Sequence, residues 1–122
     1  MIYTHHVCLL RPVGGYPIVF HQLHALQRLR GTHRVSNVFL HGKYAEEDFA
    51  PFIDSVITKF DFNIVYVHEA GNVQQVQGLS ALYKHRQALR ADNPSYLLVM
   101  NCDSCSSLPI ANMLSFHEQK QA

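Results

Sequence analysis

A carboxylate flanked by an amide and two thiols follows five apolar residues in "SYLLVMNCDSC". The apolar run Tyr96–Met100 leads directly into Asn101, Cys102 and Asp103, with Cys105 two residues later. Such a run is typical of a buried β-strand, so Asp103 is predicted to stand just beyond the carboxyl end of a strand. Ligands bind there in open parallel sheets, and Mg²⁺ is usually held by one or two carboxylates together with substrate phosphates. From the spacing alone, a simple turn or helix cap is favoured, and a metal and phosphate position at Asp103 is the alternative.

Two other groups of residues have spacings that chemistry can use. Cys102 and Cys105 have the C-x-x-C spacing, but zinc needs two further ligands and the sequence offers no second paired motif. A redox motif of this type belongs at the start of a helix after the first strands of its fold, whereas this one follows a late strand. His21 and His24 lie one helical turn apart. We expect them on a helix face with their ring edges in water.

A pair of glycines, Gly14–Gly15, precedes Tyr16–Pro17 and an apolar periodic segment. This order predicts a turn that leads into a helix. Because the first main-chain N–H groups of a helix point outward and carry partial positive charge, the helix start after such a turn can receive an anion. A double glycine is only a weak sign of such a site by itself.

Strands and helices are predicted to alternate along the chain. Three short apolar runs predict strands at 37–41, 63–67 and 96–100. Segments with apolar residues at helical spacing predict helices at 16–30, 45–60, 76–90 and 107–120. The strands are nearly continuous in apolarity, which is typical of strands covered on both faces. The pattern predicts an α/β fold with a three-layer, Rossmann-like parallel sheet.

Two prolines bear on where the predicted helices begin. Pro51 lies inside the segment 45–60, and we expect it to mark the true helix start, with 45–50 as a preceding turn. In the segment 107–120, Ser107 is the predicted N-cap and Pro109 lies in the first turn.

Composition narrows the class of protein. The chain has 122 residues and a net charge of +1 with its histidines neutral, and no basic run suggests nucleic acid as a partner. It has no apolar stretch of the roughly 20 residues that a membrane helix needs. The first ten residues do not have the layout of a signal peptide. Cys8, Cys102 and Cys105 are an odd number, which favours reduced thiols and a cytoplasmic location.

Four stretches, in this order and spacing, resemble the sugar-phosphate nucleotidyltransferases. They are "RPVGGYPIVFHQLHAL" (11–26), "VFLHGKY" (38–44), "ALYKHRQAL" (81–89) and "YLLVMNCDSCSSLPIANMLSFHEQ" (96–119). Within that family the likeness is greatest to the mannose-1-phosphate guanylyltransferases, particularly their alpha-type subunits. Single motifs are moderately specific, and their order is much more so.

The resemblance implies a reaction and a set of site residues. A sugar 1-phosphate attacks the α-phosphate of a nucleoside triphosphate such as GTP, pyrophosphate is released, and the product is a nucleotide sugar such as GDP-mannose. The residue that matches Asp103 holds Mg²⁺ in this family. The candidate nucleotide-binding residues are Gly14, Gly15, Gly78, Asn101 and Asp103.

The sequence also departs from the family pattern. The family opens with a strand and a loop of the type G-G-x-G-T-R-x-x-P, whereas the residues before Arg11 contain no glycine. We therefore expect a divergent segment at 1–10, followed by a partial nucleotidyltransferase domain at 11–122 that ends before the sugar-phosphate side of the site. Without the first strand, the strands at 37–41 and 96–100 would have a gap between them, and residues 5–10 are the predicted short substitute.

The sequence leaves two functions open. One is a nucleotidyltransferase domain with little or no activity on its own. The other is a regulatory subunit that binds a nucleotide sugar and acts on a catalytic partner subunit; a homo-oligomer is also compatible. A response-regulator-like domain would need an acidic pair after its first strand, and the sequence has none.

Overall fold

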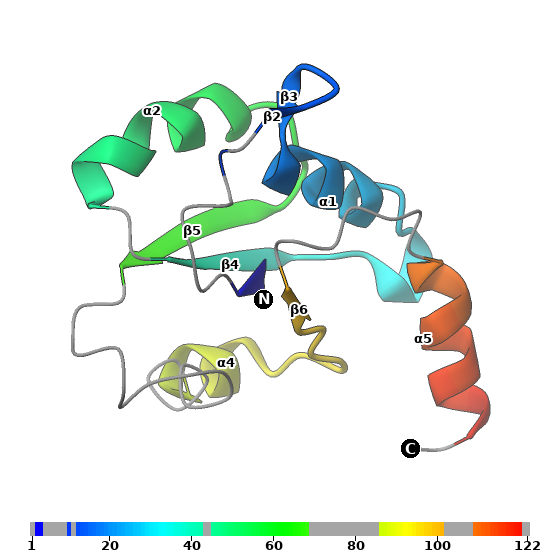
Figure 1. Cartoon of the computed structure of the whole chain (residues 1–122). Coiled ribbons are helices and arrows are strands. Elements are labelled where there is room, and N and C mark those ends of the chain that lie inside the picture. Colours follow the sequence, from blue (N-terminus) through cyan, green and yellow to red (C-terminus); the bar gives the residue numbers. More distant parts are fainter. Residues whose placement is uncertain are drawn as a thin grey trace.

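The computed structural model of the chain describes residues 2–3, 10, 12–42, 45–68, 86–101 and 109–120. Three short strands come first in these residues, and helices and strands then alternate (Figure 1). In chain order they are β1 (Ile2–Tyr3), β2 (Pro12–Val13), β3 (Tyr16–Pro17), α1 (Ile18–Gln27), the 3₁₀ turn η1 (Gly31–His33), β4 (Asn37–Gly42), α2 (Glu46–Val56), β5 (Asn63–His68), α4 (Arg86–Asp92), β6 (Met100–Asn101) and α5 (Ile110–Gln119).

Four strands form one parallel sheet in the order β5-β4-β1-β6, and β2 and β3 form a small antiparallel hairpin. The fold is therefore mixed α/β, and the prediction of a parallel sheet is confirmed. Ile2 of β1 pairs with Leu40 on one side and with Met100 on the other. The strand that fills the gap is thus Ile2–Tyr3 and not the predicted 5–10, of which only Leu10, in a turn, lies among the described residues.

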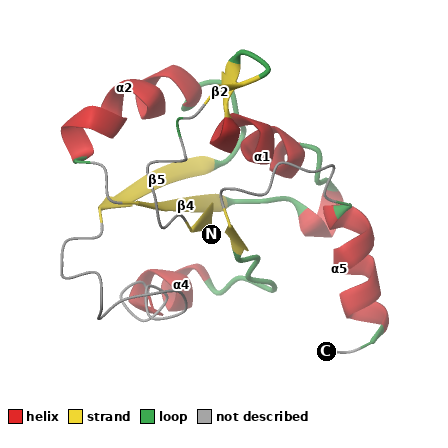
Figure 2. Cartoon of the chain, viewed as in Figure 1, coloured by secondary structure: helices red, strands yellow, loops and turns green. Residues whose placement is uncertain are grey.

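The predicted strands at 37–41 and 63–67 are confirmed, and each extends one residue further. The predicted strand at 96–100 is wrong, because only Met100–Asn101 pairs and residues 93–99 form a loop (green in Figure 2). The reason is the length of its neighbour. Strand β1 has two residues and offers main-chain partners to two residues of β6, so apolarity alone could not extend the pairing.

The core lies on the side of the sheet that α1 and α2 cover, whereas α4 lies on the other side (Figure 1). Alternate residues of β4 and β5 point to this side, because successive side chains of a strand face opposite ways. The most deeply buried apolar side chains are Val19, Leu23, Val38, Leu40, Phe49 and Val56. On the opposite face, Val65 of β5 keeps 45% of its surface exposed. The two faces of the sheet are therefore covered unequally.

Helix α2 corrects the prediction about Pro51. The helix begins at Glu46 and contains Pro51, so 45–50 is not a separate turn. Proline lacks an N–H and therefore removes one helical hydrogen bond. Packing outweighs this loss, because Phe49 is fully buried and stacks on Tyr66 with ring centroids 4.2 Å apart.

The other helix boundaries follow the sequence less closely. Helix α1 lies inside the predicted segment 16–30. Of the predicted helix at 76–90, residues 76–85 lie outside the described residues, and α4 continues to Asp92. The N-cap of α5 is Pro109 and not Ser107, and the helix begins at the buried Ile110. No helix in the described ranges combines the length and the apolar character that crossing a membrane requires.

Candidate functional site

The four parallel strands end at one edge of the sheet, which we call the carboxyl edge. Tyr3, the last residue of β1, pairs with His41 of β4 and with Asn101 of β6. Gly42, the last residue of β4, pairs with His68 of β5. Because all strands run the same way, this edge is where an open parallel sheet binds its ligands. Asn101, a predicted site residue, stands on it.

Helix α1 is anchored to the carboxyl edge by a buried glutamine. The side-chain Nε2 of Gln22 donates to the main-chain carbonyl of Asn101 at 2.6 Å, and Gln22 is only 3% exposed. A buried amide is costly unless it is hydrogen-bonded, so this contact fixes the helix against the end of β6. The side chain of Asn101 is itself exposed. The side chain of Asn101 can therefore face a ligand while its main-chain carbonyl binds Gln22 of α1.

The predicted glycine turn is confirmed as a hairpin just ahead of α1. Gly14 and Gly15 have φ values of 59° and 85°, a left-handed backbone that favours glycine. Val13 and Tyr16 pair across the turn. A Cβ on either glycine would meet nothing within 4 Å. The backbone conformation, and not crowding, is therefore what requires these glycines.

The hairpin is fastened to α1 by side chains. His21 donates from Nε2 to the carbonyl of Val13 at 2.7 Å. The ring of Tyr16 stacks on Phe20, with centroids 4.9 Å apart and 15° between the planes. His21 thus holds the hairpin turn in place. In the described part of the chain, no group of three or more His, Cys, Asp or Glu residues could hold a metal ion.

The helices that start after β3 and β4 differ in charge. The first turn of α1 has no acidic residue and no side-chain cap. The first turn of α2 carries Glu46, Glu47 and Asp48. A helix start has a partial positive charge, which these three carboxylates already offset in α2. An external anion is therefore better received at the start of α1, beside the Gly14–Gly15 turn.

Several predicted site residues cannot be placed on this edge. Gly78 and Asp103 lie outside the described residues, as do Cys102 and Cys105. The structure places Gly14 and Gly15 in the hairpin ahead of α1, and Asn101 at the end of β6. The predicted role of Asp103 as a ligand of Mg²⁺ stays a prediction.

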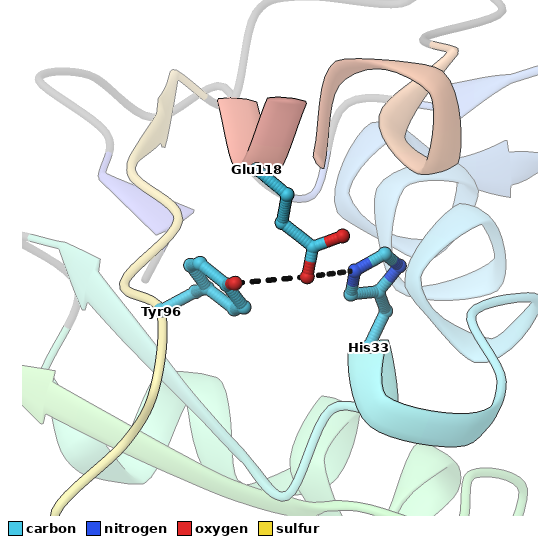
Figure 3. Close-up of polar contacts among 3 residues, drawn as sticks. All are labelled: His33, Tyr96 and Glu118. Atoms are coloured by element: carbon cyan, nitrogen blue, oxygen red, sulfur yellow. Dashed lines mark hydrogen bonds and ion pairs between the residues drawn. The ribbon is translucent and has the colours of Figure 1, made fainter. Parts of the chain in front are cut away.

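A polar cluster at the opposite edge was not predicted (Figure 3). The hydroxyl of Tyr96 donates to Oε1 of Glu118 at 2.8 Å, and Nε2 of His33 lies 3.0 Å from the same oxygen. The hydrogen bond with Glu118 raises the pKa of Tyr96. The hydrogen bonds with His33 and then Tyr96 lower the pKa of Glu118. These residues come from η1, the loop before β6 and α5, so no local spacing in the sequence announces their contact.

Curated proteins with similar sequences point to one family. A probable mannose-1-phosphate guanyltransferase of Schizosaccharomyces pombe is 34% identical over 112 residues, which are 90% of this chain and 26% of that protein. Regulatory alpha subunits of mannose-1-phosphate guanylyltransferase are each 27% identical, over 91% of the chain for Dictyostelium discoideum and 92% for Homo sapiens. No protein-family model matches the sequence. The chain spans about a quarter of the length of these relatives. The predicted resemblance is confirmed.

Proposed function

We propose that this chain, whose relatives include mannose-1-phosphate guanylyltransferase and its regulatory alpha subunits, supplies the nucleotide-binding part of a nucleotidyltransferase-type domain in the formation of GDP-mannose. The observation that carries the proposal is similarity along about nine-tenths of the chain to proteins with these names. The strand order β5-β4-β1-β6 and the glycine hairpin ahead of α1 support it. In this proposal the fold is completed as a three-layer, Rossmann-like sheet.

The nucleotide would lie at the carboxyl edge. Its phosphates would face the Gly14–Gly15 turn and the start of α1, where no acidic side chain repels them. Asn101 is exposed there and is held by Gln22 through its main chain. By resemblance, Asp103 would hold Mg²⁺, which neutralises phosphate charge when it is bound, and Gly78 would approach the base and sugar.

Chemistry on the bound nucleotide would require further groups. In the implied reaction, a phosphate oxygen of the sugar 1-phosphate forms a bond to the α-phosphorus of GTP, and the bond to pyrophosphate breaks. Catalysis of this kind depends on positioning the phosphates and stabilising their charge. Residues 1–10 contain no glycine and do not provide the phosphate loop of the family. We therefore propose weak or no turnover by this chain alone.

A regulatory role is the second candidate. It is favoured by the names of the Dictyostelium discoideum and Homo sapiens relatives, which are regulatory subunits. A chain of this kind would bind GDP-mannose without turning over GTP, and would act through a catalytic partner subunit or a homo-oligomer. The odd number of cysteines supports a reducing, cytoplasmic location for either role.

Binding and turnover measured on the same protein separate the two roles. Calorimetry with GDP-mannose gives binding, and pyrophosphate release from GTP and mannose 1-phosphate with Mg²⁺ gives turnover. Turnover that is lost in Asp103→Ala but kept in Asp54→Asn, an exposed aspartate of α2, supports an enzyme. Binding without turnover supports a regulatory subunit. If the wild-type chain neither binds GDP-mannose nor releases pyrophosphate, both roles are contradicted.

A further inference from the structure

A pocket of about 340 Å³ opens at the amino edge of the sheet, the end opposite to the proposed nucleotide site. It lies between the start of β4, the end of α4, the loop 93–99 and α5. Its volume is within the range of small-molecule sites in proteins. Among the described residues, Gly14, Gly15 and Asn101 of the proposed nucleotide site do not line this pocket.

The floor of this pocket is apolar. Leu26, Leu29, Val38 and Met100 line it, and all four belong to the buried core, with exposures of 4%, 6%, 1% and 8%. The apolar surface that a ligand can still cover belongs to Leu97, which is 46% exposed, and to half-buried lining residues such as Leu89 and Leu98. Covering it removes apolar surface from water, which is favourable and roughly proportional to the area covered. These leucines, above an apolar floor, therefore favour a ligand with a substantial apolar part.

The walls are held in place by hydrogen bonds between separate elements. Asn37, the first residue of β4, donates through its side-chain amide to Asp92 at the end of α4. The carboxylate of Glu118 in α5 accepts a hydrogen bond from the hydroxyl of Tyr96 in the loop, and the same oxygen lies 3.0 Å from Nε2 of His33 in η1 (Figure 3). These contacts fix three sides of the pocket before anything binds, which reduces the ordering cost of binding.

The polar groups of the lining define the ligand further. Arg34 is exposed, and within the described ranges its guanidinium makes no hydrogen bond or ion pair, so it is available to an anion. Asp92 is the acidic lining residue, and its carboxylate already accepts the amide of Asn37. The rings of His33 and Tyr96 lie edge to face, 6.1 Å apart at 74°, and offer aromatic surface at the rim.

We propose that this pocket binds a small aromatic carboxylic acid, whose flat ring system covers Leu97 and the half-buried leucines of the lining and whose carboxylate pairs with Arg34. An aliphatic acid would leave the aromatic rim unused, and a neutral aromatic molecule would leave the guanidinium unused. The pairing is of the planar, two-pronged kind that arginine makes with carboxylates.

A titration of the ¹⁵N-labelled full chain with 1-naphthoate, followed by NMR, tests the proposal. We expect saturable shifts of the amides of 34–38 and 95–98. The uncharged analogue 1-naphthylmethanol and the variant Arg34→Gln should each weaken binding about fivefold, the size of effect expected for one partly exposed ion pair. Arg28→Gln removes the same charge from an exposed arginine outside the lining, and should leave the affinity unchanged.

Three results would overturn the proposal. The first is the absence of a saturable shift at the lining amides of the wild-type chain. The second is equal affinity for 1-naphthoate and 1-naphthylmethanol, which needs no variant and so does not depend on how Arg34→Gln folds. The third is a set of shifts centred on Gly14, Gly15 and Gly42, which would move the ligand to the carboxyl edge.

Discussion

The two edges of the parallel sheet are fastened in different ways. On the side of the carboxyl edge, two side chains of α1 bind main-chain carbonyls: Gln22 binds that of Asn101 at the end of β6, and His21 binds that of Val13 in the hairpin. At the amino edge, side chains bind one another, as in the contact of Tyr96 with Glu118. A main-chain acceptor survives any substitution of its own side chain, whereas a side-chain pair is lost when either partner changes. The carboxyl edge is therefore built to keep its shape while its exposed side chains vary, which suits a binding edge.

Two glutamines of the same helix give the largest expected difference between the edges. Gln22 is buried at the carboxyl edge, and Gln27 bonds to Asp61 at the exposed end of α1. We expect Gln22→Ala to lower the free energy of unfolding by about 2 kcal/mol, because it removes a buried hydrogen bond and leaves a cavity. Gln27→Ala should cost less than about 1 kcal/mol. Urea unfolding of both variants measures the difference.

The Gln27 variant is a close control, since both changes replace glutamine by alanine in one helix. Equal losses of stability would mean that burial does not distinguish the edges. A loss confined to Gln27→Ala would reverse the comparison and would place the more important anchor of α1 at its exposed end.

Two glycines sharpen the comparison with respect to binding. Gly15 lies in the hairpin beside α1, and Gly31 lies in η1 at the amino edge; both have positive φ and room for a Cβ. Gly15→Ala and Gly31→Ala should each cost about 1 kcal/mol of stability, since alanine is disfavoured in a left-handed backbone. If the proposed function holds, Gly15→Ala alone should also weaken the binding of GDP-mannose in calorimetry.

Asparagine tolerates a left-handed backbone better than alanine, so Gly15→Asn should recover part of the stability. Weaker binding in both alanine variants would trace the effect to stability in general. Unchanged binding in Gly15→Ala would remove the hairpin from the proposed nucleotide site without affecting the pocket at the other edge.

The features that the sequence predicts are those that depend on neighbours in the chain. The apolar runs of β4 and β5 and the Gly14–Gly15 turn are local patterns, and the structure confirms them. The strand at 96–100 was predicted too long because pairing depends on β1, almost a hundred residues away in the sequence and only two residues long. The start at Pro51 was wrong because burial of Phe49 outweighs a local preference.

The candidate site divides in the same manner. Gly14, Gly15 and Asn101 follow local signals, a turn and a strand end, and the structure places them near the start of α1 and the end of β6. The roles of Gln22 and His21 were missed, because each depends on which main-chain carbonyl the fold brings to it. Glu118 was missed because His33, its partner, lies 85 positions away.

The smallest effect on stability is expected at the amino edge, in the cluster of His33, Tyr96 and Glu118. It should show in how stability depends on pH. The pKa of Glu118 is lowered below its ordinary value of 4.5, so its contacts stabilise the fold above that pH and are lost as the pH falls through the lowered pKa. The pKa of Tyr96 is raised above 10.0, so its contact stabilises the fold below that pH and is lost as the pH rises through the raised value.

Glu118→Gln tests the acid limb of this dependence. His33, His117 and Tyr96 are the groups that act on the carboxylate, and glutamine cannot ionise among them. The urea midpoint of the wild type should therefore fall more steeply than that of the variant between about pH 5 and about pH 3. Asp54→Asn, which removes an exposed carboxylate of α2, should leave the wild-type steepness in place. Parallel curves for the wild type and Glu118→Gln would mean that the charge of Glu118 adds nothing to stability.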